Sequence, residues 1–328
     1  MSGESRGMGT ELQDVAVIGS GYMGGGIAQV LALAGCSVAL GDVDEATATR
    51  AHARITAQTE AFEHSGLFPS GSAERIRHGV TPRASIEEAV AEAQYVTEAV
   101  PETRAIKTGV LSRISAAAPA SAVIGSNTSA IPIAELAQSV SVPERFLGVH
   151  WMNPAPFIPG VELIATEDTS AEVLASVDRL IRRAGKKPAR VSDSPGFVAN
   201  RLQFALFKEA VLMVEEGLAT AEQIDLVVSN AFGFRLALFG PFAIADMAGL
   251  DVYGASYDSL AAEYGERLAA PQALTDLVEN GHLGLKSGGG FLDIPASNQV
   301  ELLEYRDMAY ARLSQLRAEL GAAPGLES

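Results

Sequence analysis

The chain has 328 residues, of which 48% are hydrophobic, and a formal net charge of −16 at pH 7. This length and apolar content suffice for two globular domains with substantial cores, while the acidic balance argues against binding to nucleic acid or anionic membrane surfaces. The one cysteine, Cys36, excludes an intramolecular disulfide and favours a reducing compartment, so we expect a cytoplasmic protein. No apolar run approaches the roughly 20 residues that a membrane-spanning helix needs.

The first half of the chain alternates short apolar runs with longer helical segments. Residues 1–13 lack the apolar segment of a signal peptide and are predicted to be a disordered lead-in. The sequence then predicts strands at 14–20, 37–43, 94–100 and 122–128, and helices at 22–34 and 44–64 and between and after the later strands. Alternation of this kind is typical of a mostly parallel sheet covered by helices. We therefore expect an α/β fold whose N-terminal part, residues 14–193, is a Rossmann-type doubly wound sheet.

Two further strands are predicted on either side of a proline-rich connection. RFLGVHWM and GVELIAT flank NPAPFIP, and proline suits a connection better than a central strand. His150 lies in the first of these strands and Glu162 in the second, each among apolar neighbours. A buried ionisable group without a partner is costly, so the two side chains are expected to pair. The carboxylate would then fix the imidazole tautomer and leave the other ring nitrogen free to accept a proton.

The character of the sequence changes at residues 192–196, where SDSPG combines turn and helix-starting residues. From Phe197 to about Gly281 the chain predicts helices, and FVANRLQFALFKEAVLMVEEG carries apolar residues at helical spacing. We expect an all-α C-terminal domain over residues 194–293. Residues 294–328 are predicted to form an extension, with one amphipathic helix at 298–320 and a disordered tail.

A glycine-rich loop follows the first predicted strand. VIGSGYMGGG contains the pattern G-x-G-x-x-G between a strand and a helix. The first glycine permits a tight turn, the second lets the backbone approach a pyrophosphate, and the third allows the helix to pack closely on the strand. The loop residues expected to contact a dinucleotide are Gly19, Ser20, Gly21, Tyr22, Met23 and Gly24.

Asp42 indicates which dinucleotide is bound. It closes the second predicted strand, 23 residues after Gly19, where a carboxylate can accept hydrogen bonds from the adenosine ribose hydroxyls. Val43, Asp44 and Glu45 follow, with no arginine to receive a 2′-phosphate. NAD is therefore predicted in preference to NADP. A structural turn without a ligand is the alternative interpretation of the glycine loop, and its place in a strand–helix unit argues against it.

The segment GSNTSAI, residues 125–131, has two interpretations that the sequence leaves open. Its polar side chains follow a predicted strand and could face the cofactor cleft, because ligands of parallel sheets bind beyond the carboxyl ends of the strands. They could equally serve as the cap of the next helix. The remaining histidines show no metal-ligand spacing and are interpreted as structural, so no metal is expected: His52, His64, His78 and His282.

Five motifs in collinear order carry a family resemblance. VAVIGSGYMGGGIAQVLALAG, SNTSAI, GVHWMNP with VELI, DSPGFVANRL and GLKSGGGF together resemble the two-domain, NAD-dependent 3-hydroxyacyl-CoA dehydrogenases over residues 13–293. The resemblance implies an oxidoreductase of fatty acid metabolism that oxidises an L-3-hydroxyacyl-CoA, of the 3-hydroxybutyryl-CoA type, to the 3-keto compound. It also implies that the helical domain binds substrate and forms a homodimer.

The resemblance further assigns roles to individual residues. His150 would be the general base, Glu162 its partner, and Ser129 and Asn200 contacts of the substrate oxygen. Besides the glycine loop, the residues implied to contact NAD are Asp42, Glu102, Lys107, Asn153 and Lys286. Only five lysines occur in the chain, and the other three, Lys186, Lys187 and Lys208, are interpreted as surface residues.

Several departures from the family pattern favour other substrates. The usual HFFNP is HWMNP, Pro159 stands where acyl-CoA enzymes tend to carry lysine, and the arm over residues 53–71 contains one arginine and no lysine to hold CoA. The alternatives are therefore a small non-CoA alcohol, as in gulonate, carnitine or pyridine-carboxylate dehydrogenases, or a carrier-bound acyl group. A phosphate-sized hollow faced by Arg54, Arg75 and Arg77 would favour CoA. The remaining hypothesis is a dinucleotide-binding protein without catalytic activity. The presence of all four candidate catalytic residues argues against it: His150, Glu162, Ser129 and Asn200.

Overall fold

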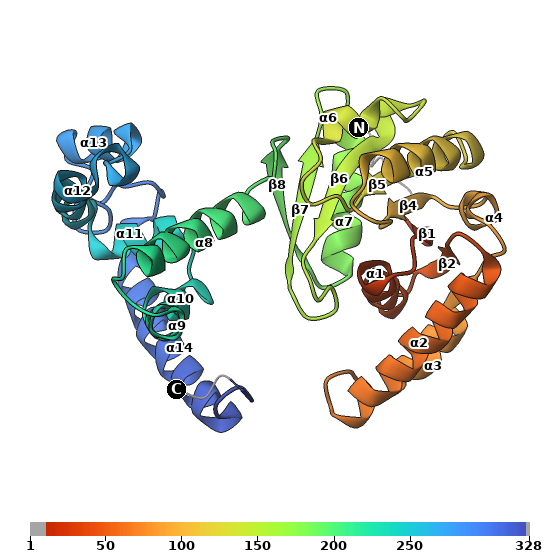
Figure 1. Ribbon diagram of the computed structural model, residues 1–328, viewed down its shortest axis with the longest axis horizontal. Helices are drawn as coiled ribbons and strands as arrows, with labels where there is room; N and C mark the ends of the chain where they lie inside the picture. The colour runs from red at the N-terminus through yellow and green to blue at the C-terminus, as the bar shows by residue number, and fades with distance from the viewer. Residues whose placement is uncertain (1–10, 326–328) are drawn as a thin grey trace, which may run out of the picture. The chain divides into compact units, whose positions relative to one another are not determined.

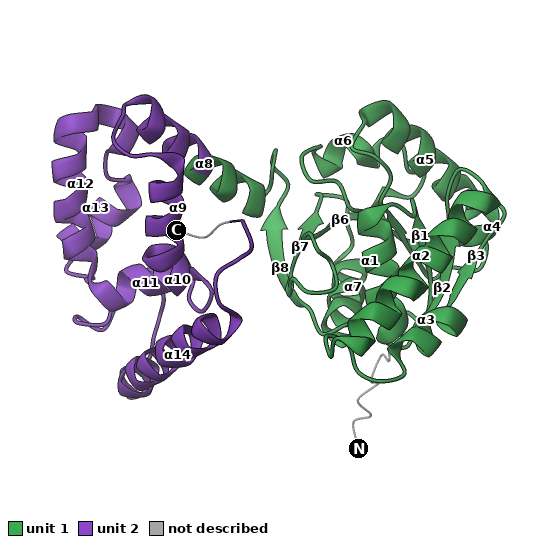
Figure 2. Cartoon of the chain, turned by 60° about the horizontal axis from the view of Figure 1, so that its bottom comes forward, with its two compact units in different colours: residues 1–206 green, residues 207–328 purple. Residues whose placement is uncertain are grey.

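The computed structural model describes residues 11–325, which form two compact units that divide between Leu206 and Phe207 (Figure 2). Most of the predicted lead-in and the last three residues of the predicted tail lie outside the described residues. The division falls inside helix α8 (Ala199–Glu215). The sequence places the domain boundary earlier, at 193/194, before that helix begins.

Unit 1 is built on one sheet of eight strands in the order β3-β2-β1-β4-β5-β6-β7-β8 (Figure 1). Every neighbouring pair is parallel except β6 and β7, which are antiparallel. The predicted α/β fold with a mostly parallel, doubly wound sheet is confirmed. The strands are β1 (Asp14–Ile18), β2 (Ser37–Gly41), β3 (Val80–Pro82), β4 (Tyr95–Glu98), β5 (Val123–Ser126), β6 (Phe146–Trp151), β7 (Gly160–Ala165) and β8 (Lys187–Ser192).

Two of these strands are additions to the predicted set. β3 has only three residues, and β8, with the sequence KPARVS, is an edge strand whose residues are all exposed or half-buried. An edge strand need not carry an apolar pattern, because one side of it faces solvent. Neither strand therefore shows the hydrophobic run that identified the others.

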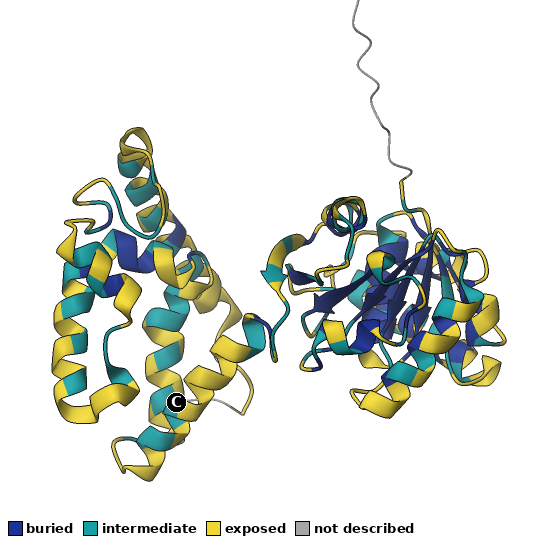
Figure 3. Cartoon of the chain, turned by 90° about the horizontal axis from the view of Figure 1, so that it is seen from above, coloured by how far each residue is buried: buried dark blue, intermediate teal, exposed yellow. Residues whose placement is uncertain are grey.

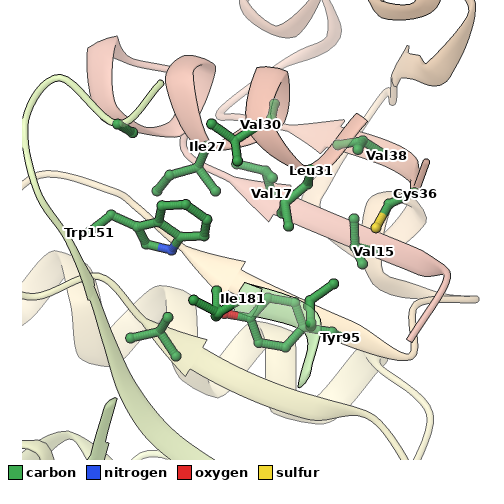
Figure 4. Packing of buried hydrophobic residues seen from close by; sticks show 14 of the residues in the cluster. Val15, Val17, Ile27, Val30, Leu31, Cys36, Val38, Tyr95, Trp151 and Ile181 are labelled. Carbon is green, nitrogen blue, oxygen red and sulfur yellow. The ribbon is translucent and has the colours of Figure 1, made fainter. Parts of the chain in front are cut away.

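Helices cover both faces of the sheet and enclose two hydrophobic clusters. Successive residues of a strand point to opposite faces, so Val15 and Val17 pack in the first cluster and Ala16 and Ile18 in the second. Figure 4 shows the first cluster, and Figure 3 shows the strands as the most deeply buried part of the unit. The helices of this unit before α8 are α1 (Tyr22–Leu33), α2 (Glu45–His64), α3 (Ser72–Gly79), α4 (Ile86–Val90), α5 (Arg104–Ala117), α6 (Ile133–Ala137) and α7 (Ala171–Arg183).

Unit 2 is helical, as the sequence predicts. Its small core joins Ala245, Leu250 and Leu274, and its last helix matches the segment predicted at 298–320. The helices after α8 are α9 (Ala221–Asn230), α10 (Phe232–Leu236), α11 (Pro241–Ala248), α12 (Leu250–Tyr264), α13 (Gln272–Glu279) and α14 (Gln299–Leu320). Among residues 11–325, no helix combines the length and the apolar character needed to cross a bilayer.

Candidate active site

A cleft of about 1060 Å³ lies in unit 1 at the carboxyl ends of the parallel strands. Its walls include Gly19 after β1 and Ala99 after β4. These two strands are neighbours in the sheet, and the strands that follow them in the chain extend the sheet in opposite directions. Such a topological switch point is where open parallel sheets bind their ligands. The predicted site residues that line this cleft are Gly19, Gly21, Tyr22, Met23, Asp42, Glu102, Ser129, His150, Asn153 and Asn200.

The glycine loop has the backbone shape that a dinucleotide requires. Gly19 has a φ of +93°, and a Cβ atom there would lie 2.7 Å from the carbonyl carbon of Ala99. At Gly24 a Cβ would lie 1.8 Å from the carbonyl oxygen of Gly19, whereas at Gly21 it would meet no atom within 4 Å. Gly21 also precedes α1 without any side-chain cap, so free N–H groups of the helix face that space. The loop therefore fits a pyrophosphate at Gly21.

Asp42 joins the end of β2 to the same loop. Its Oδ2 accepts hydrogen bonds from the Ser20 N–H at 2.6 Å and the Ser20 hydroxyl at 2.5 Å, and its Oδ1 accepts from the Val43 N–H at 2.7 Å. Ser20 is buried in this contact and Gly24 is buried against Gly19, and neither residue lines the cleft. The carboxylate of Asp42 still lines the cleft, where it can accept from ribose hydroxyls.

His150 and Glu162 are in contact, as the sequence predicts. The antiparallel register of β6 and β7 places the two residues directly opposite each other. His150 Nδ1 lies 2.8 Å from Glu162 Oε2, and both side chains are buried. Glu162 Oε1 accepts hydrogen bonds from the N–H groups of Val198 at 3.0 Å and Ala199 at 2.9 Å, where α8 begins. Each carboxylate oxygen therefore has its own partners.

These contacts keep Glu162 ionised. Burial raises the pKa of its carboxyl, but the hydrogen bonds from His150 and from the backbone of Ala199 and Val198 outweigh burial, so that the pKa lies below its ordinary value. Within the described part of the chain, the other ring nitrogen of His150, Nε2, forms no hydrogen bond, while the ring lines the cleft. The pair can thus accept a proton from a ligand in the cleft.

Of the two interpretations that the sequence left open for residues 125–131, the structure bears out the cleft and not the helix cap, because α6 begins after Pro132 without a side-chain cap. Ser126 and Thr128 are buried, and the hydroxyl of Ser126 donates to Glu98 Oε2 at 2.6 Å. Asn127 and Ser129 line the cleft instead, and Asn127 Oδ1 accepts from the Trp151 N–H at 2.8 Å. Alternate residues therefore support the fold and face the cleft.

Glu102 organises the turn that carries Ser129. Its Oε1 accepts from the Thr128 hydroxyl at 2.6 Å and from the N–H groups of Ser129 at 2.9 Å and Ala130 at 3.0 Å. Burial raises the pKa of Glu102, but these hydrogen bonds and the nearby Lys107 ammonium hold it below its ordinary value. Asn200 Nδ2 donates to the Ser129 carbonyl at 2.9 Å, which ties the start of α8 to the same turn.

The two lysines that the resemblance implies as cofactor contacts each form an ion pair within their own unit. Lys107 is buried, with Nζ 2.8 Å from Glu98 Oε1 and 3.3 Å from Glu102 Oε2, and it does not line the cleft. Lys286 belongs to unit 2, where its Nζ lies 2.6 Å from Asp251 Oδ1. Within unit 1, the Lys107 ammonium therefore supports Glu98 and Glu102 and does not form part of the cleft wall.

Sequence analysis missed the buried pair of Glu98 and Lys107. Glu98 ends an apolar strand, so the reasoning that singled out Glu162 as a carboxylate in apolar surroundings applied to it equally. Gln203, on α8, lines the cleft and was also missed, because a glutamine on a helix carries no distinguishing pattern.

The three arginines of the arm formed by α2 and α3 do not face the cleft. Arg54 Nη2 donates to the carbonyls of Ser20 at 2.8 Å and Gly21 at 3.1 Å. Arg77 forms ion pairs with Glu60 and Glu74, and Arg75 lines a separate cavity at the N-terminal ends of β1 and β2. None of the three lines the cleft. In the range 11–325, no group of three or more histidine, cysteine or carboxylate side chains is arranged to hold a metal.

Comparison with known proteins identifies the family. Residues 14–194 match the model of the 3-hydroxyacyl-CoA dehydrogenase NAD-binding domain, and residues 196–294 match that of the C-terminal domain. The chain is 37% identical over 281 residues to 5-formyl-3-hydroxy-2-methylpyridine 4-carboxylate 5-dehydrogenase of Mesorhizobium japonicum. This alignment covers 85% of this chain and 90% of that protein. It is 34% identical over 284 residues to a probable 3-hydroxybutyryl-CoA dehydrogenase of Bacillus subtilis, with 86% and 98% covered.

A solved structure shares both the fold and the sequence pattern. The crystal structure of the 3-hydroxyacyl-CoA dehydrogenase of Archaeoglobus fulgidus matches with a TM-score of 0.76 and 30% identity, covering 92% of this chain and 99% of that one. The predicted NAD cofactor is confirmed by the family match and agrees with the shape of the glycine loop. The chain therefore belongs to the 3-hydroxyacyl-CoA dehydrogenase family and is an NAD-dependent dehydrogenase that acts on CH–OH groups.

Proposed function

We propose that this enzyme oxidises the secondary hydroxyl of an L-3-hydroxyacyl-CoA, of the 3-hydroxybutyryl-CoA type, to the 3-keto compound. The observation that carries the proposal is the contact of 2.8 Å between His150 and Glu162 in the wall of the cleft that fits NAD. A proton acceptor at that place is what removal of a hydroxyl proton requires. The same site supports the reverse reduction, with protonated His150 as the acid.

In the proposed mechanism the pair acts as a single base. His150 Nε2 accepts the hydroxyl proton, while Glu162 holds a proton on Nδ1 and stabilises the imidazolium that results. The α8 N–H groups fix the other oxygen of Glu162, so the carboxylate cannot rotate away from the ring. The chemistry that bound NAD would supply is a hydride acceptor for the carbon that bears the hydroxyl.

Ser129 and Asn200 are proposed to meet the charge that develops on the substrate oxygen. Both line the cleft together with His150, and each carries a donor. Asn200 uses one amide hydrogen on the Ser129 carbonyl, which leaves the second available to a ligand. Glu102 would contribute by holding the Ser129 turn in place.

For NAD itself, the proposed contacts are the loop at Gly21 for the pyrophosphate, Asp42 for the adenosine ribose, and Asn153 near the nicotinamide. Asn153 lies three residues after His150 and lines the same cleft. Lys286 is kept as a proposed contact from unit 2, and Lys107 as a support of Glu102.

A panel of alcohols tests this proposal. Purified enzyme would be assayed for NADH formation with L-3-hydroxybutyryl-CoA, with the free 3-hydroxy acid, and with the D-isomer of the thioester. The proposal expects turnover of the L-thioester with kcat/KM at least about tenfold above that of the other two. Absence of turnover with every 3-hydroxyacyl thioester would contradict it.

A small alcohol without CoA is the second candidate, and the charges of unit 1 favour it. Arg113 is the one arginine in the cleft wall, and it forms hydrogen bonds to both oxygens of Glu87. Arg54 and Arg77 are also engaged, so the described residues of unit 1 offer the phosphates of CoA no free cation at the cleft. The relative from Mesorhizobium japonicum is named for a pyridine carboxylate substrate. In the same assay this candidate expects free hydroxy acids or pyridine carbinols to exceed the thioester.

We also propose a homodimer formed through the helical domain. α8 buries none of its residues within the chain, and Phe204 and Phe207 remain 60% and 64% exposed. An exposed apolar face of this kind is typical of an interaction surface.

We also propose a cytoplasmic location, because the buried thiol of Cys36 forms no disulfide.

A further inference from the structure

Lys186 was interpreted from the sequence as a surface lysine, and that interpretation is wrong. The residue precedes β8 and is only 6% exposed. Its ammonium group donates to three backbone carbonyls, those of Ala155 at 2.5 Å, Ile158 at 2.8 Å and Pro156 at 3.1 Å. Across residues 11–325 it forms no ion pair with a carboxylate. Burying a charge without a charged partner costs free energy, so the position of this ammonium needs a structural explanation.

All three carbonyls belong to the connection between β6 and β7, residues 152–159. One ammonium has three N–H donors, so this single connection satisfies every donor of Lys186. In return, Lys186 satisfies three carbonyls that have no backbone partner in the described chain. The connection contains three prolines, which have no backbone N–H group to donate to a carbonyl. A side chain with three donors therefore replaces the backbone contacts that a strand or helix would supply.

The same connection also contributes to the wall of the cofactor cleft. Met152 and Asn153 at its start and Ile158 near its end line the cleft. From α1, Gly26 approaches so closely that a Cβ atom would lie 3.1 Å from Pro156 Cδ. The connection is thus held by α1 at Pro156 and by Lys186 at Ala155, Pro156 and Ile158, the last of which itself lines the cleft.

We propose that Lys186 is a positioning residue that fixes the 152–159 connection and so pre-forms the nicotinamide end of the cofactor cleft. The inference rests on the proposed place of the nicotinamide, beside His150 and Asn153. Asp42 and Gly21, proposed for the adenosine ribose and the pyrophosphate, belong to other segments: Asp42 follows β2, and Gly21 lies in the loop between β1 and α1. Loss of Lys186 should therefore weaken the binding of the nicotinamide half of the cofactor and leave the binding of the ADP-ribose half unchanged.

The chemistry of the contact explains why lysine serves here. The ammonium is a compact donor that can point its hydrogens at three converging oxygens, whereas a guanidinium presents a planar fork. Burial lowers the pKa of Lys186, and no carboxylate opposes that effect. The three carbonyl dipoles are what stabilises the charged form in this place.

The test compares two ligands and two neighbouring lysines. Lys186→Met and the matched control Lys187→Met, at an exposed position, would be titrated calorimetrically with NADH and with ADP-ribose, which lacks the nicotinamide. The inference predicts that K186M binds NADH at least about tenfold more weakly, binds ADP-ribose within about twofold of the wild type, and that K187M changes neither. One tenfold step corresponds to about 1.4 kcal/mol of binding free energy.

Three results would overturn the inference: equal weakening of both ligands in K186M, which would indicate a purely structural role; wild-type affinity for both; or the same loss in K187M. Should K186M fail to fold, Lys186→Gln keeps two donors and is expected to show the same selective loss to a smaller degree. Because both ligands are cofactor fragments, the result can be read even if no alcohol in the substrate panel is oxidised.

Discussion

The two carboxylate oxygens of Glu162 have different hydrogen-bond partners, so a substitution of this residue removes two kinds of contact. Oε2 faces His150, and Oε1 receives the N–H groups of Val198 and Ala199 at the start of α8. One carboxylate thus orients the candidate base and also caps a helix. Replacing it changes both the chemistry of the cleft and the stability of the unit.

Glu162→Gln is predicted to lower stability in a pH-dependent way. The native pKa of Glu162 is below its ordinary value, so the carboxylate contributes stability that is complete above the ordinary carboxyl pKa of about 4.3 and is lost as pH falls through the lowered native value. Urea unfolding should show the variant about 2 kcal/mol less stable at pH 7, and this difference should shrink as the pH falls below the ordinary carboxyl pKa. A gap that does not change with pH would contradict the role of the charge.

Among elements, the glycine loop and the β6–β7 hairpin define the site. The loop comes close to Ala99 after β4, and the hairpin register brings the candidate base to its carboxylate. Both are local features: the spacing of glycines and the alternation of two strands about a proline-rich connection. This is why the sequence was sufficient to predict them.

Two glycines of one loop are predicted to respond differently to the same change. Gly24→Ala places Cβ 1.8 Å from the Gly19 carbonyl oxygen, so we expect a loss of stability of several degrees in the melting temperature. Gly21→Ala meets open space and has a φ of −59°, so the fold should keep its melting temperature while NADH binding weakens by at least about tenfold. Equal melting temperatures, or unchanged NADH binding in G21A, would contradict this account of the loop.

The residues that sequence analysis misplaced depend on contacts between distant elements. Lys186 resembles its exposed neighbour Lys187, and only the path of the β6–β7 connection over it reveals that it is buried. β8 is similarly hidden, because as an edge strand it pairs with β7 on one side only and carries a polar sequence. Local patterns cannot predict such features, since the partner lies about 30 residues away in the chain.

For the whole molecule, the exposed apolar residues of α8 are the feature that the single chain leaves unexplained. A helix whose apolar stripe finds no partner within its own chain is expected to bury it against another.

Phe207→Asp is therefore predicted to weaken self-association. A charge in an apolar interface should raise the dimer dissociation constant by at least about a hundredfold, equivalent to about 2.7 kcal/mol. Light scattering after size-exclusion chromatography would measure it. Leu67→Asp, at a residue on unit 1 that is 58% exposed, serves as the control and should leave the mass unchanged. A wild-type monomer at micromolar concentration, or equal effects of both changes, would contradict the proposed surface.

The most direct test of the central claim is the turnover rate of His150→Asn on whichever alcohol the wild type oxidises best, with NADH affinity measured on the same preparation. The account predicts that kcat falls by about 10² to 10⁴, the usual contribution of a general base, while the dissociation constant for NADH stays within about twofold. A variant that binds NADH normally and keeps its full kcat would show that the pair of His150 and Glu162 is not the proton acceptor.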